Sequence, residues 1–284
     1  MKLGIIMEGG ASRTVFSCGV SDRFLEEGIM PDYFAGVSAG IAYGVSYLSG
    51  QKGRNRKIFE EYMADKRYMG MKYLFDKKMK SFYNIPFVFG EVPNKLVPFD
   101  YDAFAAYPGE VEAVVTNIHT GQAEYLKVPR DDHNFDVIVA SCSLPILFQP
   151  VKVGKHYYLD GGIADSIPWK RAQEKGCDRI IVILTRKRDY VKSTDRSVKL
   201  AAKLYREYPK LAQSLFDRAD SYNQCLKELY QAEKEGKVFV IAPEELHGVG
   251  RTEAKAEKLD LLYEEGYRIA DEQMEALKRY LEGR

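Results

Sequence analysis

Two short apolar runs, each followed by a segment with helical periodicity, begin the chain. The apolar runs predict buried strands at residues 2–7 and 33–36. The segments after them predict helices at residues 12–27 and 39–48, and in the first of these apolar side chains recur every four residues. Because crossovers between consecutive parallel strands are right-handed, this order predicts two parallel strands. Their carboxyl ends then share the sheet edge at which ligand sites of open α/β sheets form.

The remainder of the chain continues the alternation of strands and helices. Further strands are predicted at residues 111–117, 123–127, 156–159, 180–184 and 238–242. Helices are predicted at residues 135–141, 171–175, 195–235 (with an interruption near Pro209) and 253–281. Residues 54–98 are less regular and are expected to cap the sheet. This alternation over most of the length favours a single α/β domain.

Composition excludes several classes of protein. With 45% hydrophobic and 29% charged residues the chain is globular, and its formal net charge of +1 gives no field that would recruit nucleic acid. The four cysteines are far apart, so they predict neither a metal site nor disulfides and suit a reducing compartment. The first apolar run is too short for a signal peptide, and no stretch approaches the roughly 18 apolar residues of a spanning helix. We expect a cytoplasmic protein, with attachment to a membrane surface left open.

The sequence GVSAG at residues 36–40 lies between a predicted strand and a predicted helix. That context is required for a G-x-S-x-G nucleophile elbow, in which a sharp turn exposes the serine. Ser38 would then lie near a helix N-terminus, where partial positive charge favours a developing anion. A glycine-flanked serine is also common in ordinary turns and at helix N-caps.

Two other segments could complete a reaction centre. The loop of Gly9, Gly10 and Ala11 precedes a helix and could present backbone N–H groups to an oxyanion. The alternatives are a phosphate loop, whose characteristic spacings are absent, or a plain turn. Asp160, at the start of the sequence DGG, follows an apolar strand and could bring a carboxylate to the same edge. Asp-Gly is also an ordinary turn sequence.

Taken together, these segments resemble the patatin-like phospholipase family, and in particular its bacterial branch. The similar segments are EGGASR (8–13), GVSAG (36–40), ASCSLP (140–145) continuing to FQPV (148–151), and DGG (160–162). They occur in the family's order within about the first 185 residues. The resemblance implies a three-layer α/β fold, with a mostly parallel central sheet and helices on both faces. It also implies a catalytic core at residues 1–185 and a mainly helical part at 186–284 packed on the same domain.

The resemblance also implies a function. The family's members are serine acyl hydrolases with a Ser–Asp dyad, in which Ser38 is at the nucleophile position and Asp160 at the base position. The implied substrate is a lipid ester, and no cofactor or metal is implied.

The oxyanion loop of the family corresponds to Gly9, Gly10 and Ala11, and Arg13 matches its basic position. Two residues depart from the family's pattern, Ala11 where a third glycine is usual and Thr14 where the last glycine is usual. If position 11 requires positive φ, the alanine Cβ strains the loop by on the order of 1 kcal/mol.

Alternatives remain open from the residues themselves. The same acyl-serine could pass its acyl group to an alcohol or thiol, or the chain could be a non-catalytic protein that binds an anion or a lipid. His247 could complete a Ser–Asp–His triad. Basic and aromatic residues interleave at 66–83, which predicts either a lid or lipid-contacting surface, or aromatics packed on the body with lysines in solvent.

Overall fold

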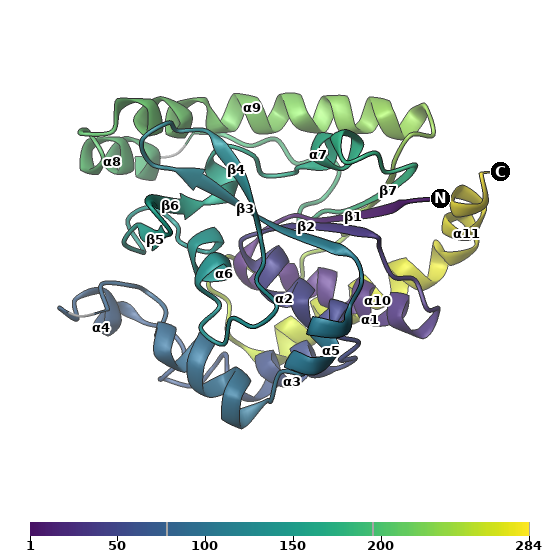
Figure 1. The fold of residues 1–284 in the computed structure, drawn as a ribbon, viewed down its shortest axis with the longest axis horizontal. Coiled ribbons are helices and arrows are strands. Elements are labelled where there is room, and N and C mark those ends of the chain that lie inside the picture. Colours follow the sequence, from purple (N-terminus) through teal and green to yellow (C-terminus); the bar gives the residue numbers. More distant parts are fainter. Residues whose placement is uncertain (78, 195, 284) are drawn as a thin grey trace.

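The computed structural model describes residues 1–77, 79–194 and 196–283. Lys78 of the basic and aromatic stretch, and Asp195 at the start of the helices predicted at 195–235, lie outside the described residues. Helices cover both faces of one central sheet (Figure 1). The expected α/β fold, with a mostly parallel sheet and a helical C-terminal part, is confirmed.

The sheet is parallel at its centre and antiparallel at one margin. Its strands are β1 (Leu3–Met7), β2 (Tyr33–Val37), β3 (Glu110–Asn117), β4 (Ala123–Lys127), β5 (Val151–Val153), β6 (His156–Asp160), β7 (Arg179–Ile183) and β8 (Phe239–Ile241). Strand β1 pairs in parallel with β2 and β7, β2 with β3, and β7 with β8. Strands β4 and β6 are antiparallel to β3, and β5 is antiparallel to β6. Strand β5 was not predicted, because three residues are too few for a pattern.

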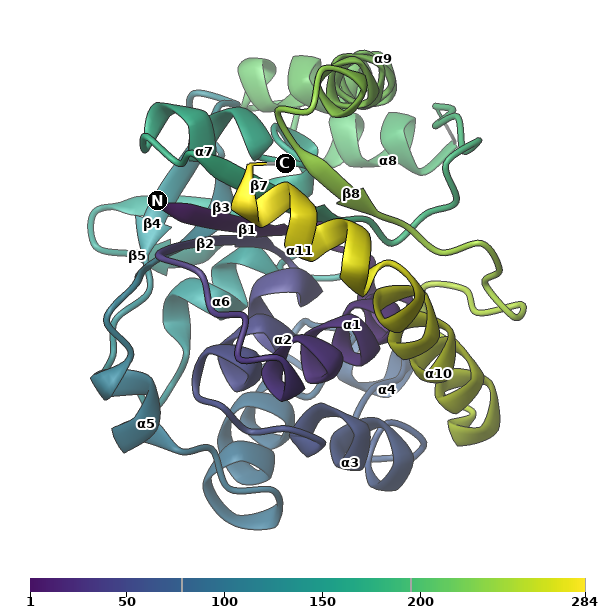
Figure 2. The same ribbon diagram turned by 90° about the vertical axis from the view of Figure 1, so that its right-hand side faces the viewer.

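Alternate residues of the central strands belong to two separate cores. Ile5 and Met7 of β1 pack into the larger core, whereas Ile6 between them packs into the core on the opposite face. Since successive side chains of a strand point to opposite faces, a continuous apolar run marks a strand covered on both sides. Figure 2 shows the helices above and below the strands.

The helices divide between the two faces of the sheet (Figure 1). One layer contains α1 (Val15–Glu26), α2 (Ala39–Leu48), α3 (Arg54–Glu61), α6 (Asp136–Ser141) and α10 (Ala256–Glu272). The other contains α7 (Trp169–Glu174) and α9 (Pro209–Lys234), with α8 (Arg196–Leu204) packed on α9. The break between α8 and α9 confirms the interruption predicted near Pro209.

Two predictions for helices need correction. The single helix expected at 253–281 is α10 followed by α11 (Met274–Glu282), with an interruption at Gln273. The segment expected to be irregular contains, besides α3 and the short α4 (Met71–Leu74), a π-helix at η2 (Pro86–Leu96). Pro93 lies inside η2 and has no N–H to donate, and the wider winding differs from the 3.6-residue period used for prediction. Helix α5 (Tyr101–Ala106) follows it.

Candidate active site

Ser38 lies at the sharp turn between β2 and α2. It is a non-glycine residue with φ 54° and ψ −126°, a conformation that L residues rarely adopt. A Cβ on Gly36 would lie 2.6 Å from the Cα of Ile41, and one on Gly40 would lie 2.3 Å from the Met7 carbonyl oxygen. Only glycine therefore fits on either side of the turn, as a nucleophile elbow requires.

A second serine fixes the backbone of the elbow. The N–H of Ser38 donates to Oγ of Ser141 at 2.9 Å, and that hydroxyl donates to the Val114 carbonyl of β3 at 2.7 Å. The strained turn is therefore tied to the centre of the sheet. Ser141 was not singled out from the sequence, although it lies in the segment ASCSLP, because its bridging role depends on a contact between distant elements.

Strand β3 brings Asp160 to the elbow. One edge of β3 pairs with β2 along Glu110–Val114, and the other edge pairs with β4. Residues 115–117 of β3 pair with β6, and residues 115 and 116 of β3 also pair with β4. Because β4 occupies one edge of β3, β6 must lie along the other edge, which is the edge that β2 occupies. Strands β2 and β6 therefore meet end to end. Val37 is opposite Val114 and Asp160 is opposite the next residue, Val115.

The backbone and carboxylate of Asp160 are both held. Its N–H donates to the Ser143 carbonyl and its carbonyl accepts from Oγ1 of Thr116, both at 2.8 Å. Oδ1 accepts from the N–H of Gly162 at 2.8 Å, whereas Oδ2 is buried and has no hydrogen-bond partner. Because the residue is only 2% exposed, Oδ2 is a buried acceptor without a proton donor.

Burial raises the pKa of Asp160 above its usual range. The nearby Ser38 hydroxyl opposes this most, followed by Arg218, the Gly162 N–H and Arg251. Ser38 thus lies close enough to favour the charged carboxylate, although no group donates a hydrogen bond of ordinary length and angle to Oδ2. A carboxylate with a raised pKa and a free oxygen beside a hydroxyl is suited to accept its proton.

The loop after β1 packs directly against the elbow. A Cβ on Gly9 would lie 2.5 Å from the Val37 carbonyl oxygen, so only glycine allows this approach. Within the described part of the chain, the N–H groups of Gly9, Gly10 and Ala11 donate no hydrogen bond. Ala11 has φ 51°, the positive value at which alanine is strained by about 1 kcal/mol. The loop therefore offers free N–H groups at the cost of local strain.

The two residues that follow Ser12 are buried. Arg13 is 6% exposed and its Nε has no hydrogen-bond partner. Burial, followed by repulsion from Arg186 and Arg251, lowers the pKa of Arg13 to about 10. Thr14, at the position where the family's last glycine is usual, is fully buried and its hydroxyl has no partner.

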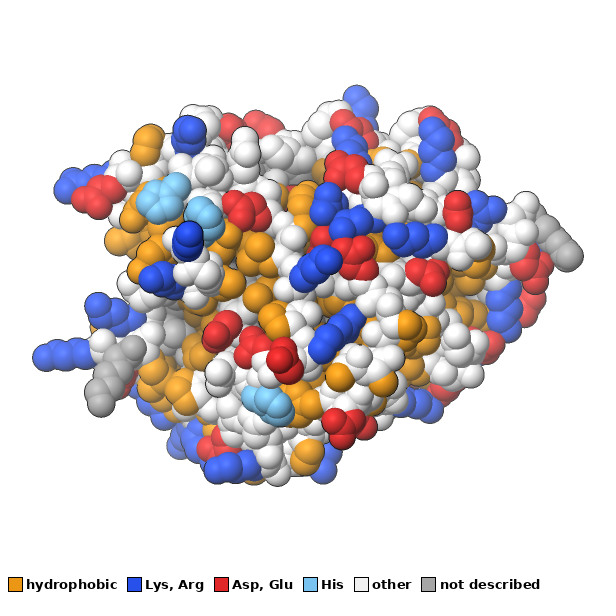
Figure 3. Space-filling model, in the orientation of Figure 1, with side chains coloured by type: hydrophobic (Ala, Val, Ile, Leu, Met, Phe, Trp, Pro, Cys, Tyr) orange, Lys and Arg blue, Asp and Glu red, His pale blue; other side chains and the backbone are white. Residues whose placement is uncertain are grey.

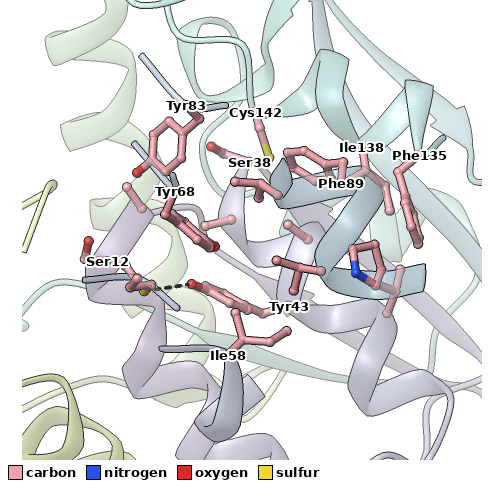
Figure 4. A pocket seen from close by; sticks show the side chains of 18 of the residues that line it. Ser12, Ser38, Tyr43, Ile58, Tyr68, Tyr83, Phe89, Phe135, Ile138 and Cys142 are labelled. Carbon is pink, nitrogen blue, oxygen red and sulfur yellow. Dashed lines mark hydrogen bonds between the residues drawn. The ribbon is translucent and has the colours of Figure 1, made fainter. Parts of the chain in front are cut away.

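Two cavities of opposite character meet at Ser38 and share it with Ala11 and Leu144. The apolar cavity spans about 950 Å³, counting space open to solvent. Figure 4 shows Ser38 facing a space enclosed by aromatic and aliphatic side chains. It is lined mainly by Ala42, Tyr43, Val45, Ile58, Met63, Tyr68, Tyr83, Val88, Phe89, Val92, Pro93, Phe99, Phe135, Ile138, Cys142 and Phe148. The polar cavity, which also borders Ser38, spans about 480 Å³, again counting space open to solvent.

Two potential competitors for the chemistry do not fit. Burial raises the pKa of the Cys142 thiol, which lies beside Ser38 in Figure 4, and so keeps it neutral. His247 lines neither cavity, and its Nε2 lies 3.8 Å from Oε2 of Glu265 on α10. The geometry gives no support to a triad with His247. Among residues that the structure describes, no group of three or more His, Cys, Asp or Glu side chains could hold a metal.

The basic and aromatic stretch is partly packed on the body of the protein and partly exposed. Tyr68 is buried against Tyr83, which stacks on Phe148, so these aromatics pack on the body. Phe75, by contrast, is 78% exposed, and Lys77 is exposed as well. In Figure 3, lysine and arginine side chains project over α4 at the left edge. No helix in the described ranges is long and apolar enough to cross a membrane.

Comparison with models of protein families finds matches in two parts of the chain. The model of the patatin-like phospholipase family matches residues 5–172, more than half of the chain, and a domain of unknown function (DUF6363) matches residues 208–282. The uncharacterized protein YjjU of Escherichia coli K12 is 28% identical over 201 residues, covering 65% of this chain and 52% of its own. This chain thus spans about half the length of that curated relative. VipD from Legionella pneumophila overlays with a TM-score of 0.46 and 13% identity, over 97% of this chain and 67% of its own.

Proposed function

Because the chain belongs to the patatin-like phospholipase family, we propose that it is a lipid acyl hydrolase with Ser38 as nucleophile and Asp160 as general base. One observation carries the assignment to these residues. The unpartnered Oδ2 of a buried carboxylate lies beside a serine held in a strained turn between two cavities. A serine hydroxyl is a weak nucleophile at its free pKa, so it needs such a base.

In the proposed reaction, Oγ of Ser38 attacks the acyl carbonyl carbon and its proton passes to Oδ2 of Asp160. Free N–H groups of the loop at Gly9, Gly10 and Ala11 stabilise the oxyanion of the tetrahedral intermediate. The bond between the acyl carbon and the leaving oxygen then breaks, and Asp160 returns the proton to the departing alcohol. Water repeats the sequence on the acyl-serine, which releases the fatty acid and restores both residues.

The two cavities suit different parts of the proposed substrate. The apolar cavity has the aliphatic and aromatic lining that suits a fatty acyl chain, and it lies next to the attacking oxygen. The leaving alcohol then occupies the polar cavity, from which water also enters. The exposed Phe75 and Lys77 would contact the lipid surface that holds the substrate.

Covalent labelling tests the nucleophile. A fluorophosphonate should add one label to the wild-type protein by intact mass and none to Ser38→Ala. Ser12→Ala removes a different hydroxyl that lines the apolar cavity and should label like wild type. Equal labelling of Ser38→Ala and wild type would contradict the assignment. Release of free fatty acid without an added alcohol would separate hydrolysis from acyl transfer.

A further inference from the structure

The polar cavity beside Ser38 holds an excess of positive charge. Five cationic side chains line it against two carboxylates, Glu8 and Asp160. The cationic residues are Arg13, Arg186, Lys192, Arg218 and Arg251. The chain as a whole is nearly neutral, at a formal net charge of +1, so this is a local concentration of charge.

Glu8 attracts these cations but forms no ion pair with them among the described residues, because neutral donors occupy its carboxylate oxygens. Oε2 accepts from the N–H of Thr185 at 2.6 Å and from its hydroxyl at 3.0 Å. Oε1 accepts from the hydroxyl of Tyr222 at 2.7 Å. The carboxylate is 4% exposed and its hydrogen bonds fix the wall of the cavity.

Four of these cations form no ion pair with a carboxylate in the part of the chain that the structure describes. The ion pairs within the described ranges include none formed by Arg13, Arg186, Lys192 or Arg251, and the buried Nε of Arg13 has no partner. Burial, followed by repulsion from Arg218, Arg251 and Arg186 against attraction from Glu8, lowers the pKa of Lys192 to about 7. With five cations against two carboxylates, like charges in the unliganded cavity repel one another, and an anion would relieve that repulsion.

Most of the cationic side chains of this cavity come from outside the family match at residues 5–172. Of the five cationic residues, only Arg13 belongs to that match, and residues 208–282, matched to the domain of unknown function, supply two. The wall is held firmly. The N–H of Lys192 donates to Oδ1 of Asn223 at 2.8 Å and its carbonyl accepts from Nδ2 at 2.9 Å, while Nε of Arg218 donates to the Gly162 carbonyl at 2.5 Å.

We propose that this cavity binds the phosphate-bearing, net-negative head group of a phospholipid whose acyl chain occupies the apolar cavity. The inference rests on the proposed hydrolase function, since Ser38 at the junction places the scissile ester between the two. Guanidinium groups match phosphate oxygens in paired hydrogen bonds. Several cations are more than a ligand with a single carboxylate would require, so a phosphate fits this cavity better. A zwitterionic head group would place its own cation among these five and is therefore disfavoured.

Discrimination between two short-chain substrates tests the proposal. Dihexanoyl phosphatidic acid and dihexanoyl phosphatidylcholine, both below their micelle concentrations at pH 6.5, avoid effects of surface charge. Wild type should favour the acid in kcat/KM. The ratio of kcat/KM for the acid to kcat/KM for the choline lipid should fall about 10-fold or more in the double variant Lys192→Gln, Arg251→Gln. This is the effect expected for losing charge-assisted hydrogen bonds. Lys192→Arg should keep the ratio, as should Lys227→Gln, which removes an exposed charge from α9 outside this cavity. An unchanged ratio in the double variant would overturn the proposal.

Equilibrium binding separates this inference from the proposed hydrolysis. Calorimetry with Ser38→Ala should show tighter binding of the acid than of the choline lipid, and the double variant should abolish that difference. Preferential binding by a protein that never hydrolyses either lipid would overturn the hydrolase function alone. Hydrolysis without a charge preference would overturn the head-group inference alone. Inorganic phosphate should bind more weakly than the lipid, and equal affinity would refute recognition of a lipid head group.

Discussion

Replacing Asp160 by asparagine should abolish most turnover while making the protein more stable. The exchange keeps the shape of the side chain and the acceptor for the Gly162 N–H, but removes the negative charge and the basic Oδ2. Loss of a positioned base lowers rates by roughly 100- to 10,000-fold, which is about 3–5 kcal/mol of activation free energy. The fall should be in kcat more than in KM, because Asp160 receives the proton of Ser38 in the transition state.

The gain in stability follows from burial. The pKa of Asp160 is raised in the folded protein, so ionising it is harder there than in the unfolded chain. Its contribution to stability is therefore complete below the unfolded pKa and is lost as pH rises through the folded pKa. At neutral pH the asparagine variant avoids this loss. Each kcal/mol recovered should raise Tm by about 2–4 °C, and wild type and variant should converge as pH is lowered.

Three measurements check the prediction. Turnover of a p-nitrophenyl ester gives kcat and KM, thermal denaturation by circular dichroism gives Tm, and a pH series shows whether wild-type turnover falls as pH drops through a raised pKa. His247→Ala is the matched control and should change turnover little, because His247 lines neither cavity. Wild-type turnover in Asp160→Asn, or inactivity of His247→Ala, would refute the dyad. A lower Tm for Asp160→Asn would refute the argument from burial.

Three further predictions follow from the loop, the cationic wall and the exposed segment. Ala11→Gly should relieve about 1 kcal/mol of strain at φ 51° and raise Tm by about 2–4 °C, and an unchanged or lower Tm would show that the loop bears no such strain. KM for an anionic short-chain phospholipid should rise as pH increases through about 7, where Lys192 loses its charge. Lys192→Arg should flatten that rise, and equal profiles for both proteins would exclude Lys192 as the cause. Phe75→Ser with Lys77→Glu should reduce co-sedimentation with anionic vesicles, and equal pelleting would indicate that this segment only packs on the body.

The sequence predicted the elbow and the central strands because their patterns are local. Residues 33–40 contain both the apolar run and the glycines that the turn requires, so the sharp turn at Ser38 was readable without tertiary information. The strain at Ala11 was also predicted, conditional on a positive φ that the structure shows. The three-residue β5 and the π-helix η2 were missed, since neither is long or regular enough to give a periodic signal.

The polar cavity could not be predicted, because its charges are brought together only by the fold. Arg218 lies on a long helix and Arg251 in a loop, where single arginines usually point into solvent. The strand pairing that brings Asp160 to the elbow could not be predicted from the sequence either. Its strand is antiparallel to β3 and reaches Ser38 from the opposite direction, a pairing that depends on contacts between residues far apart in the sequence.

Because β2 and β6 meet end to end, the catalytic spacing can stay constant in evolution while the preference for fatty acids of a given length changes. Each strand is registered to β3 and neither to the other, so the spacing between nucleophile and base is set by adjacent rungs at Val114 and Val115. The connection at residues 49–109, which supplies much of the apolar cavity, can therefore lengthen, shorten or change sequence without moving that spacing. Insertions there would alter which fatty acids fit while the proton transfer stays intact.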